Sequence, residues 1–300
     1  MKNKLAYVLV VIGASLWGII GIFIHELSNA GFTSLQIVTL RVVSAAIMLV
    51  SYLLISDAQL LKINMKDTPV FAGTGIMSIV FFNWCYFTAI QEVSLSIAVM
   101  LLYTGPAFVI LLSRIFFKEY FNYPKIIALL FTAVGCMLVI QLFPLSNKTI
   151  SFYGVLVGLG SGFGYALYSI FGKVALRKHP PITIITYTFV FASLALLPTS
   201  GLTLDSTLLF SPNILITILG LGLFPTVLAY LLYTIGLSMI ESGKASITAT
   251  MEPVIATALG VFMFNEVLTG FQIVGIFLII SAVIILQIKG KKRKTVARTP

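Results

Sequence analysis

The feature that most constrains the fold is an internal repeat with a spacing of 147 residues. At this spacing Pro106 matches Pro253, and Glu119 matches Glu266. Further identical pairs in the same register are Gly13 and Gly160, Gly73 and Gly220, Gly75 and Gly222, and Tyr86 and Tyr233. Because the register holds without a gap, the sequence predicts two copies of one unit, residues 1–147 and 148–300.

The composition predicts an all-α membrane protein. Of 300 residues, 59% are hydrophobic and 9% are charged, and the mean hydropathy is +1.08, which excludes an ordinary soluble domain. Apolar stretches of about 17 to 25 residues are long enough to cross a bilayer as helices, and their continuity argues against a β-barrel. The expected spans are residues 5–24, 37–55, 69–90, 94–116, 124–143, 151–174, 182–198, 213–237, 243–264 and 271–288.

The number of spans in each copy determines how the two copies are related. Five spans are expected in each half, and five is odd, so the second copy crosses the membrane in the opposite sense. The sequence therefore predicts ten transmembrane helices in two inverted five-helix repeats, an architecture typical of transporters.

The basic residues indicate a multi-pass protein of the cell (inner) membrane with both termini in the cytoplasm. In this topology all but two of the 19 Lys and Arg residues fall on the cytoplasmic side, as the positive-inside rule requires. The exceptions are Lys148, in an outer loop, and Arg41, within the second span. The net charge of +10 could indicate nucleic acid binding, but the tail after Gln287 lacks interleaved aromatic residues. We expect it to contact anionic lipid, with no nucleic acid partner.

Two segments imitate other motifs. The N-terminus, with Lys2, Lys4 and an apolar run, resembles a secretory signal, but the run is too long and its Gly13-Ala14-Ser15 recurs as Gly160-Ser161-Gly162, so it is expected to be the first span. The glycine run between Gly154 and Gly164 superficially resembles a phosphate-binding loop. Because it lies inside an apolar helix, close helix packing is the better interpretation.

The sequence favours no enzyme, cofactor or metal site. His25 and His179 fall near span ends without ligand spacing, and no paired carboxylates, nucleophile elbow or Walker loop is present. Cys85 and Cys136 lie in apolar spans and are expected to be buried thiols. Glu119 and Glu266 are interpreted as structural residues that cap the next helix or turn.

Glu252 is the principal candidate for a substrate-binding residue. It lies near the middle of the ninth span, where an ionisable group is costly unless it faces water or a partner. The alternative is a protonated structural carboxyl. Arg41, five residues into the second span, either faces the same chamber or extends to the outer headgroups. Glu252 and Arg41 correspond to Gly105 and Thr188 in the opposite repeats, so each half contributes one charge, and a small zwitterion could bridge the two.

Aromatic and polar residues at mid-span complete the candidate substrate site. We expect spans one, three, four, six, eight and nine to line it between the two repeats, and the apolar spans five and ten to pack outside it. The predicted binding residues besides Glu252 and Arg41 are Trp17, Asn83, Tyr86, Tyr103, Tyr168, Tyr230 and Thr248, with Trp84, Tyr165 and Tyr233 nearby.

Pro106 and Pro253 are candidate hinges near the middles of spans four and nine. Each proline removes one backbone donor and loosens the helix, which in a transporter exposes a carbonyl to a cavity. The alternative is a kink that serves packing alone.

The chain resembles the ten-helix, EamA-type members of the drug/metabolite transporter superfamily over essentially its whole length. The residues that carry the resemblance are Ala14-Ser15-Leu16-Trp17-Gly18, Leu40-Arg41, Gly105-Pro106 with Glu119, and Glu252-Pro253 with Asn265-Glu266. Tyr165 departs from the pattern, because a Trp is common there. The resemblance implies a carrier of small metabolites, often an exporter of amino acids or amines, that works by alternating access.

The expected function is therefore secondary transport of a small amine, amino acid or similar zwitterion, with export the favoured direction. Import of a cationic metabolite such as a quaternary amine is the alternative, because aromatic faces and one acid would recognise it. A membrane-embedded enzyme or scaffold is a third possibility. A phosphate-ester carrier would require more embedded Lys or Arg residues. The substrate, the coupling ion and the oligomeric state are not defined by the sequence.

Overall fold

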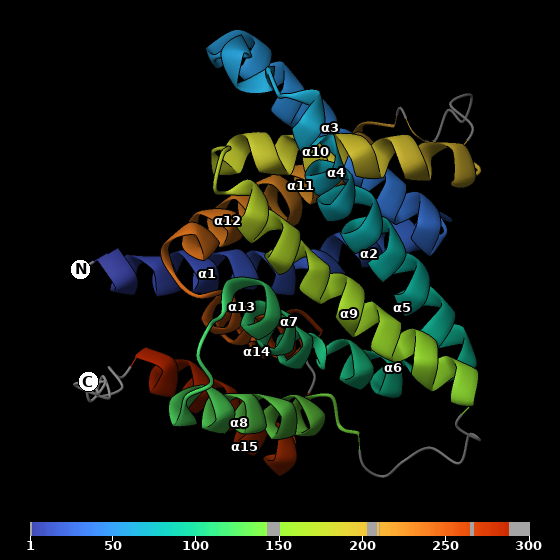
Figure 1. The fold of residues 1–300 in the computed structure, drawn as a ribbon. Helices are drawn as coiled ribbons and strands as arrows, with labels where there is room; N and C mark the ends of the chain where they lie inside the picture. The colour runs from blue at the N-terminus through green and yellow to red at the C-terminus, as the bar shows by residue number, and fades with distance from the viewer. Residues whose placement is uncertain (1, 143–150, 203–208, 210, 265–266, 288–300) are drawn as a thin grey trace, which may run out of the picture.

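The computed structural model describes residues 2–142, 151–202, 209, 211–264 and 267–287, and its elements within these residues are helical (Figure 1). The first half contains α1 (Lys2–Gly18), α2 (Ile20–Asn29), α3 (Ser34–Ser56), η1 (Ala58–Leu61), η2 (Met65–Asp67), α4 (Thr68–Ala72), η3 (Gly73–Val80), α5 (Phe81–Glu92), α6 (Leu95–Leu102), α7 (Gly105–Phe117) and α8 (Tyr123–Val139). The second half contains α9 (Phe152–Ala175), α10 (Pro181–Leu196), η4 (Leu197–Thr199), α11 (Pro212–Gly222), η6 (Leu223–Leu228), α12 (Ala229–Met239), α13 (Ser242–Ala249), α14 (Met251–Phe264) and α15 (Gly270–Gln287).

The helices confirm the expected ten-span membrane fold. Within the described residues, 9 helical segments are long and apolar enough to cross a bilayer, and α8 is a shorter apolar helix of 17 residues that supplies the tenth span. Several spans consist of consecutive helices, such as α1 with α2 and α6 with α7. In Figure 1 the start of α1 and the end of α15 lie at the same end of the bundle, as an even number of spans requires.

Helix bounds recur at the spacing of the sequence repeat. α6 and α13 begin and end at residues that are 147 positions apart, and α8 and α15 begin at Tyr123 and Gly270. Wide π-helical turns also fall at corresponding places, in η3 and η6. The expected boundary between the copies, at residues 147 and 148, lies outside the described residues, as do Lys148, Asn265, Glu266 and the basic tail.

The first span of each half differs in whether its helix is continuous. The first span is interrupted at Ile19, between α1 and α2, whereas α9 is continuous from Phe152 to Ala175. Gly18, at the interruption, packs so closely on α14 that an added Cβ would lie 2.9 Å from the Glu252 carbonyl oxygen. The sequence did not indicate this break.

Close helix packing explains the glycine run of α9. A Cβ at Gly162 would lie 2.9 Å from the Leu101 carbonyl oxygen, and a Cβ at Gly164 would lie 3.0 Å from the Phe82 Cα. α9 therefore lies directly against α5 and α6, as the packing interpretation predicted. Outside this centre, α8 and α15 pack on each other along one side of the bundle (Figure 1).

Glu119 has a structural role, but it caps a different helix from the one that the sequence predicted. Glu119 does not cap the next helix, α8, whose N-cap is Asn122. Its carboxylate instead accepts the backbone N–H groups of Ser242 and Gly243, at 2.7 and 3.3 Å, and so caps α13 of the other half. The sequence could not show this, because the two segments are adjacent only in the folded chain.

Candidate functional site

A cavity of about 220 Å³ lies at the centre of the bundle, at the place where several spans are interrupted. Its volume is slightly below the range typical of drug-sized ligand pockets and suits a small metabolite. Spans one, two, three, four, six, eight and nine line it, and the lining contains no residue of α8 or α15. The lining residues are Trp17, Ile20, Ile24, Val38, Arg41, Phe82, Asn83, Tyr86, Phe87, Leu102, Tyr103, Pro106, Tyr165, Tyr230, Ala249, Thr250 and Glu252.

Two helix breaks at equivalent positions of the repeats form part of this lining. α6 ends at Leu102 before Pro106, and α13 ends at Ala249 before Pro253. A proline has no N–H, so it cannot donate the hydrogen bond that the carbonyl four residues earlier receives in a continuous helix. The carbonyls of Leu102 and Ala249 therefore lack this helical donor, and the Leu102 oxygen packs against α9, 3.1 Å from where a Cβ on Gly162 would lie.

The cavity wall contains two charged side chains of opposite sign, Arg41 on α3 and Glu252 on α14. Arg41 does not extend toward headgroups, since it is 8% exposed, its Nη2 donates to the Tyr230 hydroxyl at 3.5 Å, and its guanidinium lies 5.9 Å from the Tyr230 ring centre. Neither charge takes part in an ion pair among the described residues. Both are therefore available to a ligand in the cavity.

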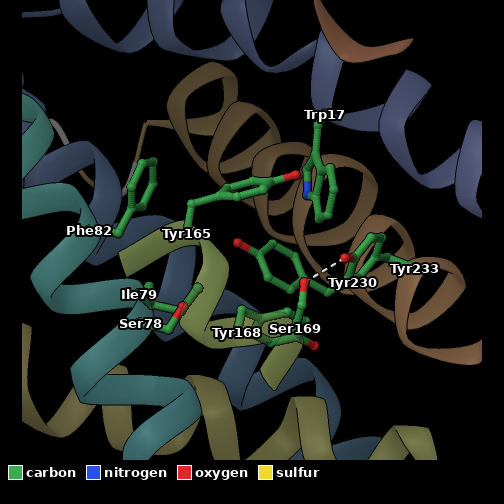
Figure 2. A pocket seen from close by; sticks show the side chains of 9 residues that line it. All are labelled: Trp17, Ser78, Ile79, Phe82, Tyr165, Tyr168, Ser169, Tyr230 and Tyr233. Atoms are coloured by element: carbon green, nitrogen blue, oxygen red, sulfur yellow. Dashed lines mark hydrogen bonds between the residues drawn. The ribbon is translucent and has the colours of Figure 1, made fainter. Parts of the chain in front are cut away.

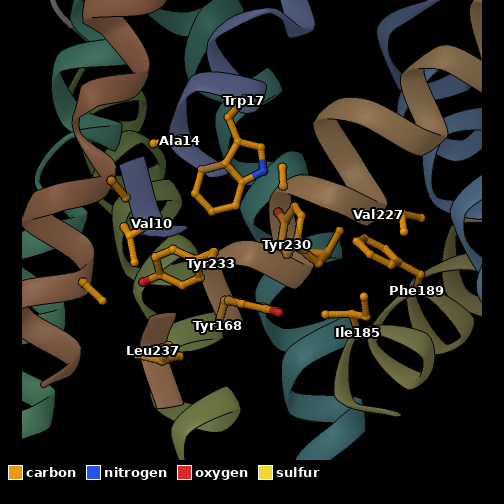
Figure 3. Packing of buried hydrophobic residues seen from close by; sticks show 14 of the residues in the cluster. Val10, Ala14, Trp17, Tyr168, Ile185, Phe189, Val227, Tyr230, Tyr233 and Leu237 are labelled. Atoms are coloured by element: carbon orange, nitrogen blue, oxygen red, sulfur yellow. The ribbon is translucent and has the colours of Figure 1, made fainter. Parts of the chain in front are cut away.

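Aromatic rings form much of the remaining wall. Trp17 lies edge-on to Tyr230, with ring centres 5.0 Å apart, and 5.2 Å from Tyr233 (Figure 3). On α5, Phe82 stacks on Tyr86 at 5.9 Å, and it lies 6.5 Å from Tyr165 of α9. These contacts hold the rings in place by packing against helices from both halves, so the wall is largely preformed.

A second cavity of about 20 Å³, large enough for about one water molecule, adjoins the first and shares Trp17, Phe82, Tyr165 and Tyr230 with it (Figure 2). Hydrogen bonds between α9 and α12 border it: Ser169 with Tyr233 at 2.6 Å, and Tyr168 with Thr234 at 2.7 Å. Beyond them, Lys173 donates to the carbonyls of Leu237 and Ile240. The bundle is thus closed by polar contacts on this side of the main cavity.

The structure brings most of the predicted site residues together. Those that line the main cavity are Trp17, Arg41, Asn83, Tyr86, Tyr103, Pro106, Tyr230 and Glu252. Tyr168 lines the small cavity instead. Their role in substrate binding stays a prediction.

Three residues considered from the sequence lie elsewhere. Thr248 is fully buried and its hydroxyl donates to the Lys244 carbonyl, so it does not line the cavity. The reason is the break after Ala249, which ends the helical register that would have placed Thr248 one turn from Glu252, and Thr250 lies in the wall instead. Pro253 is buried behind the wall, and Trp84 is 56% exposed on the outside of α5.

Phe82, Phe87, Thr250 and the aliphatic part of the wall were not predicted from the sequence. Phe87 follows Asn83 by four residues and shares its helix face, so helical spacing from Asn83 could have identified it. Ile20, Ile24, Val38, Leu102 and Ala249 carry no comparable signal, because aliphatic residues are frequent on every face of a membrane helix. The described residues contain no cluster of three His, Cys, Asp or Glu side chains suited to a metal ion.

This arrangement defines a class of protein: a multi-pass membrane carrier whose site lies among interrupted helices in the middle of the bundle. Comparison with known sequences identifies the family. The chain belongs to the EamA-like transporter family, whose sequence profile matches it twice, over residues 4–141 and 152–288. This family lies in the drug/metabolite transporter superfamily, and its members are transporters and not enzymes.

Individual relatives agree with the family. The chain is 28% identical to an uncharacterized transporter of Archaeoglobus fulgidus over 92% of this chain and 94% of the relative, and 27% identical to the uncharacterized transporter YwfM of Bacillus subtilis over 98% of each. It is 27% identical to the threonine/homoserine exporter RhtA of Salmonella typhimurium over 67% of this chain and 65% of RhtA. A solved crystal structure with 16% identity superposes with a TM-score of 0.79 over 94% of this chain and 96% of that chain, which supports the fold.

Proposed function

We propose that this transporter exports a small metabolite with an amino group, such as an amino acid or amine, across the cell membrane by alternating access. The observation that carries the proposal is the position of Glu252, the single acidic side chain of the cavity wall, at a helix break and without an ion-pair partner among the described residues. An acid in such a low-dielectric site suits an ammonium group. The similarity to the exporter RhtA supports the direction and the substrate class.

Alternating access is supported by the architecture. Two inverted repeats that meet at one cavity can expose that cavity to each side in turn by moving against each other. The cavity lining extends from mid-span along α2, the start of α3 and the end of α5, while polar contacts between α9 and α12 close the opposite side. On the proposed topology, with both termini in the cytoplasm, this conformation faces outward.

Import of a quaternary amine is the second candidate, favoured by the aromatic wall formed by Trp17, Tyr86 and Tyr230. The two candidates differ in direction. An exporter lowers the intracellular concentration of its substrate when it is expressed, whereas an importer raises it. Comparing metabolites inside and outside cells with and without the protein therefore separates them.

The principal test is the variant Glu252→Gln, measured as uptake of labelled L-threonine, L-homoserine and choline into proteoliposomes. The amide preserves the volume and removes the charge, so we expect transport of the active substrate to fall to background at normal expression. Glu26→Gln, at an exposed position near the end of α2, is the matched control and should transport normally. Unchanged transport and unchanged pH dependence in Glu252→Gln would contradict the proposal.

A further inference from the structure

The helices that lead from the two breaks toward the Lys125 end of the bundle pack on each other. α7 begins at the break before Pro106, α13 ends at the break after Ala249, and the two helices lie against each other between the cavity and this end (Figure 1). A Cβ added to Gly243 of α13 would lie 2.9 Å from Cγ1 of Ile110 on α7. The equivalent helices of the opposite repeats, α6 and α14, make no comparable contact within the described residues. α7 and α13 therefore close one side of the cavity.

Side chains of both halves join these two helices at the end away from the cavity. Glu119, just after α7, accepts the backbone N–H groups of Ser242 and Gly243 at the start of α13. Lys125 lies 3.4 Å from the Glu119 carboxylate and 2.9 Å from that of Glu241. The side chains of Glu119 and Lys125 are 9% and 2% exposed, so water competes weakly for these contacts. We name Glu119, Lys125 and Glu241 the charged gate, because together they hold the start of α13 on the first half.

Two of the three charges of the gate are not repeated at the opposite end of the bundle. At the spacing of the repeat, Lys125 matches Gln272 and Glu241 matches Ser94, and both of these residues are uncharged. Ser94 caps α6 through its own hydroxyl, which accepts the N–H of Ile97. An equilibrium between two conformations shifts by the free energy of the contacts that only one of them makes. The charged gate therefore favours the conformation that is closed at the Lys125 end.

We propose that the charged gate sets the side that the empty carrier faces: it keeps the path between the cavity and the cytoplasm closed, and it must separate each time a substrate passes there. The inference goes beyond the proposed function and rests on its alternating access and its topology. When α13 moves away from α7, Ser242 and Gly243 leave the Glu119 carboxylate. Glu119 is a gating residue that does not touch the substrate, because the 8 residues of α13, about 12 Å of helix, separate Ser242 from the cavity wall.

The test measures the side from which a cysteine in the cavity wall can be modified. The reporter is Leu102→Cys, at the end of α6, and the probe is a charged methanethiosulfonate that does not cross membranes, applied to right-side-out and inside-out vesicles. Cys85 and Cys136 are buried, and protein without the reporter gives their background reaction. We expect the reporter to react mainly from the outer side, because the charged gate closes the cytoplasmic path.

Two variants of the reporter protein weaken the gate to different degrees. Glu119→Gln keeps the side-chain volume but removes the charge beside Lys125 and one of the two oxygens that cap α13. Modification from the cytoplasmic side should become about tenfold faster or more, and modification from the outer side slower. Glu241→Gln, at a more exposed position, should shift both rates less in the same direction, and it tests the gate if Glu119→Gln folds poorly. Asp67→Asn is the matched control, because it removes another ion pair between the halves, with Lys178, away from α7 and α13, and should leave both rates unchanged.

The outcomes separate the charged gate from the proposed function. Unchanged rates in Glu119→Gln and Glu241→Gln, or faster modification from both sides, would overturn the gate, and so would a reporter that reacts equally from both sides before any change at the gate. The same shift in Asp67→Asn would show that any ion pair between the halves acts in this way, and would overturn the specific role of Glu119. The labelling requires no substrate, so a carrier that moves neither amino acids nor amines but shows the expected shift would contradict the proposed function alone.

Discussion

Among single residues, Lys125 shows how the two halves are joined at one end of the bundle. Although it is a lysine, it is 2% exposed, and its Nζ lies 3.4 Å from Glu119 of its own half and 2.9 Å from Glu241 of the other. Burial raises the pKa of the Glu241 carboxyl, but Lys125 and Lys244 outweigh this and lower that pKa below its usual value. The carboxylate of Glu241 is therefore held ionised between two lysines.

We expect Lys125→Met to lower the free energy of unfolding by about 3 kcal/mol at pH 7. This is the low end of the range for breaking a buried ion pair, since Glu241 is 39% exposed and solvent screens part of the effect. Thermal unfolding of the purified protein in detergent measures the difference. Lys178→Met is the matched control, because Lys178 is 67% exposed in its pair with Asp67 and should contribute less than about 1 kcal/mol.

Comparing the free energy of unfolding of wild type and Lys125→Met at acidic pH tests the role of Glu241. Its pKa is lower in the folded protein than in the unfolded chain, so its ionisation stabilises the fold above the unfolded pKa, and this stabilisation is lost as the pH falls through the folded pKa. The difference between wild type and Lys125→Met should therefore shrink at acidic pH. A difference that is absent at pH 7, or equal at pH 7 and pH 3, would show that the ion pairs do not hold this end together.

At the scale of helices, the central feature is the pair of breaks before Pro106 and Pro253. The helix before each break is short, since α6 and α13 have 8 residues each, and the helices after the breaks, α7 and α14, have 13 and 14. Short helices joined at a break can change their relative angle without unfolding, which is what alternating access requires of the spans around a central site. The breaks therefore remain the candidate hinges.

We expect Pro106→Ala to slow transport more than it weakens binding. Alanine restores an N–H that can bond the Leu102 carbonyl and make the span more continuous and stiffer. Initial rates of substrate counterflow in proteoliposomes should fall several-fold, with substrate affinity within about a factor of three. Pro212→Ala, at the first turn of α11 where no break follows, is the control. Wild-type rates in Pro106→Ala would leave the prolines with a packing role only.

The sequence predicted the spans and much of the site, but it did not predict the breaks in detail. Hydropathy is averaged over a window, so a continuous helix and two short helices give the same signal, and the interruption at Ile19 was missed. For the same reason Thr248 was placed on the face of Glu252, although the helical register ends at Ala249. Arg41 and Glu252 were found because charges are rare in spans, whereas Ile24 or Val38 could be located only in the folded chain.

For the whole molecule, the arrangement implies a definite orientation in the membrane. The spans around the cavity come from both halves, while α8 and α15 pack together beside it. The close match between the basic residues and the ends of the spans predicts cytoplasmic termini. Lys125 and Lys178 then lie on the cytoplasmic side, together with the ion pairs that join the halves.

Reporter fusions test this orientation. Fusions after Lys66, Lys125 and Lys178 should report the cytoplasm, and a fusion after Lys148, in the segment outside the described residues, should report the exterior. Alkaline phosphatase and green fluorescent protein give opposite signals at each site, which controls for expression. An exterior signal at Lys125 would be incompatible with the ten-helix topology.

The contacts around Gly18 and Glu252 also predict what would follow if one half of the chain were replaced by a second copy of the other half. Gly18 of the first half packs on the backbone carbonyl of Glu252, where an added Cβ would lie 2.9 Å from the oxygen. At the equivalent contact, Gly105 packs on the side chain of Tyr165, where an added Cβ would lie 2.7 Å from the ring. A chain made of two first halves would set glycine against glycine and have no central acid. One made of two second halves would place a tyrosine where Gly18 now packs, at a contact that has no room even for a Cβ. The two halves are therefore complementary at this contact, and we expect that neither duplicated chain would rebuild it.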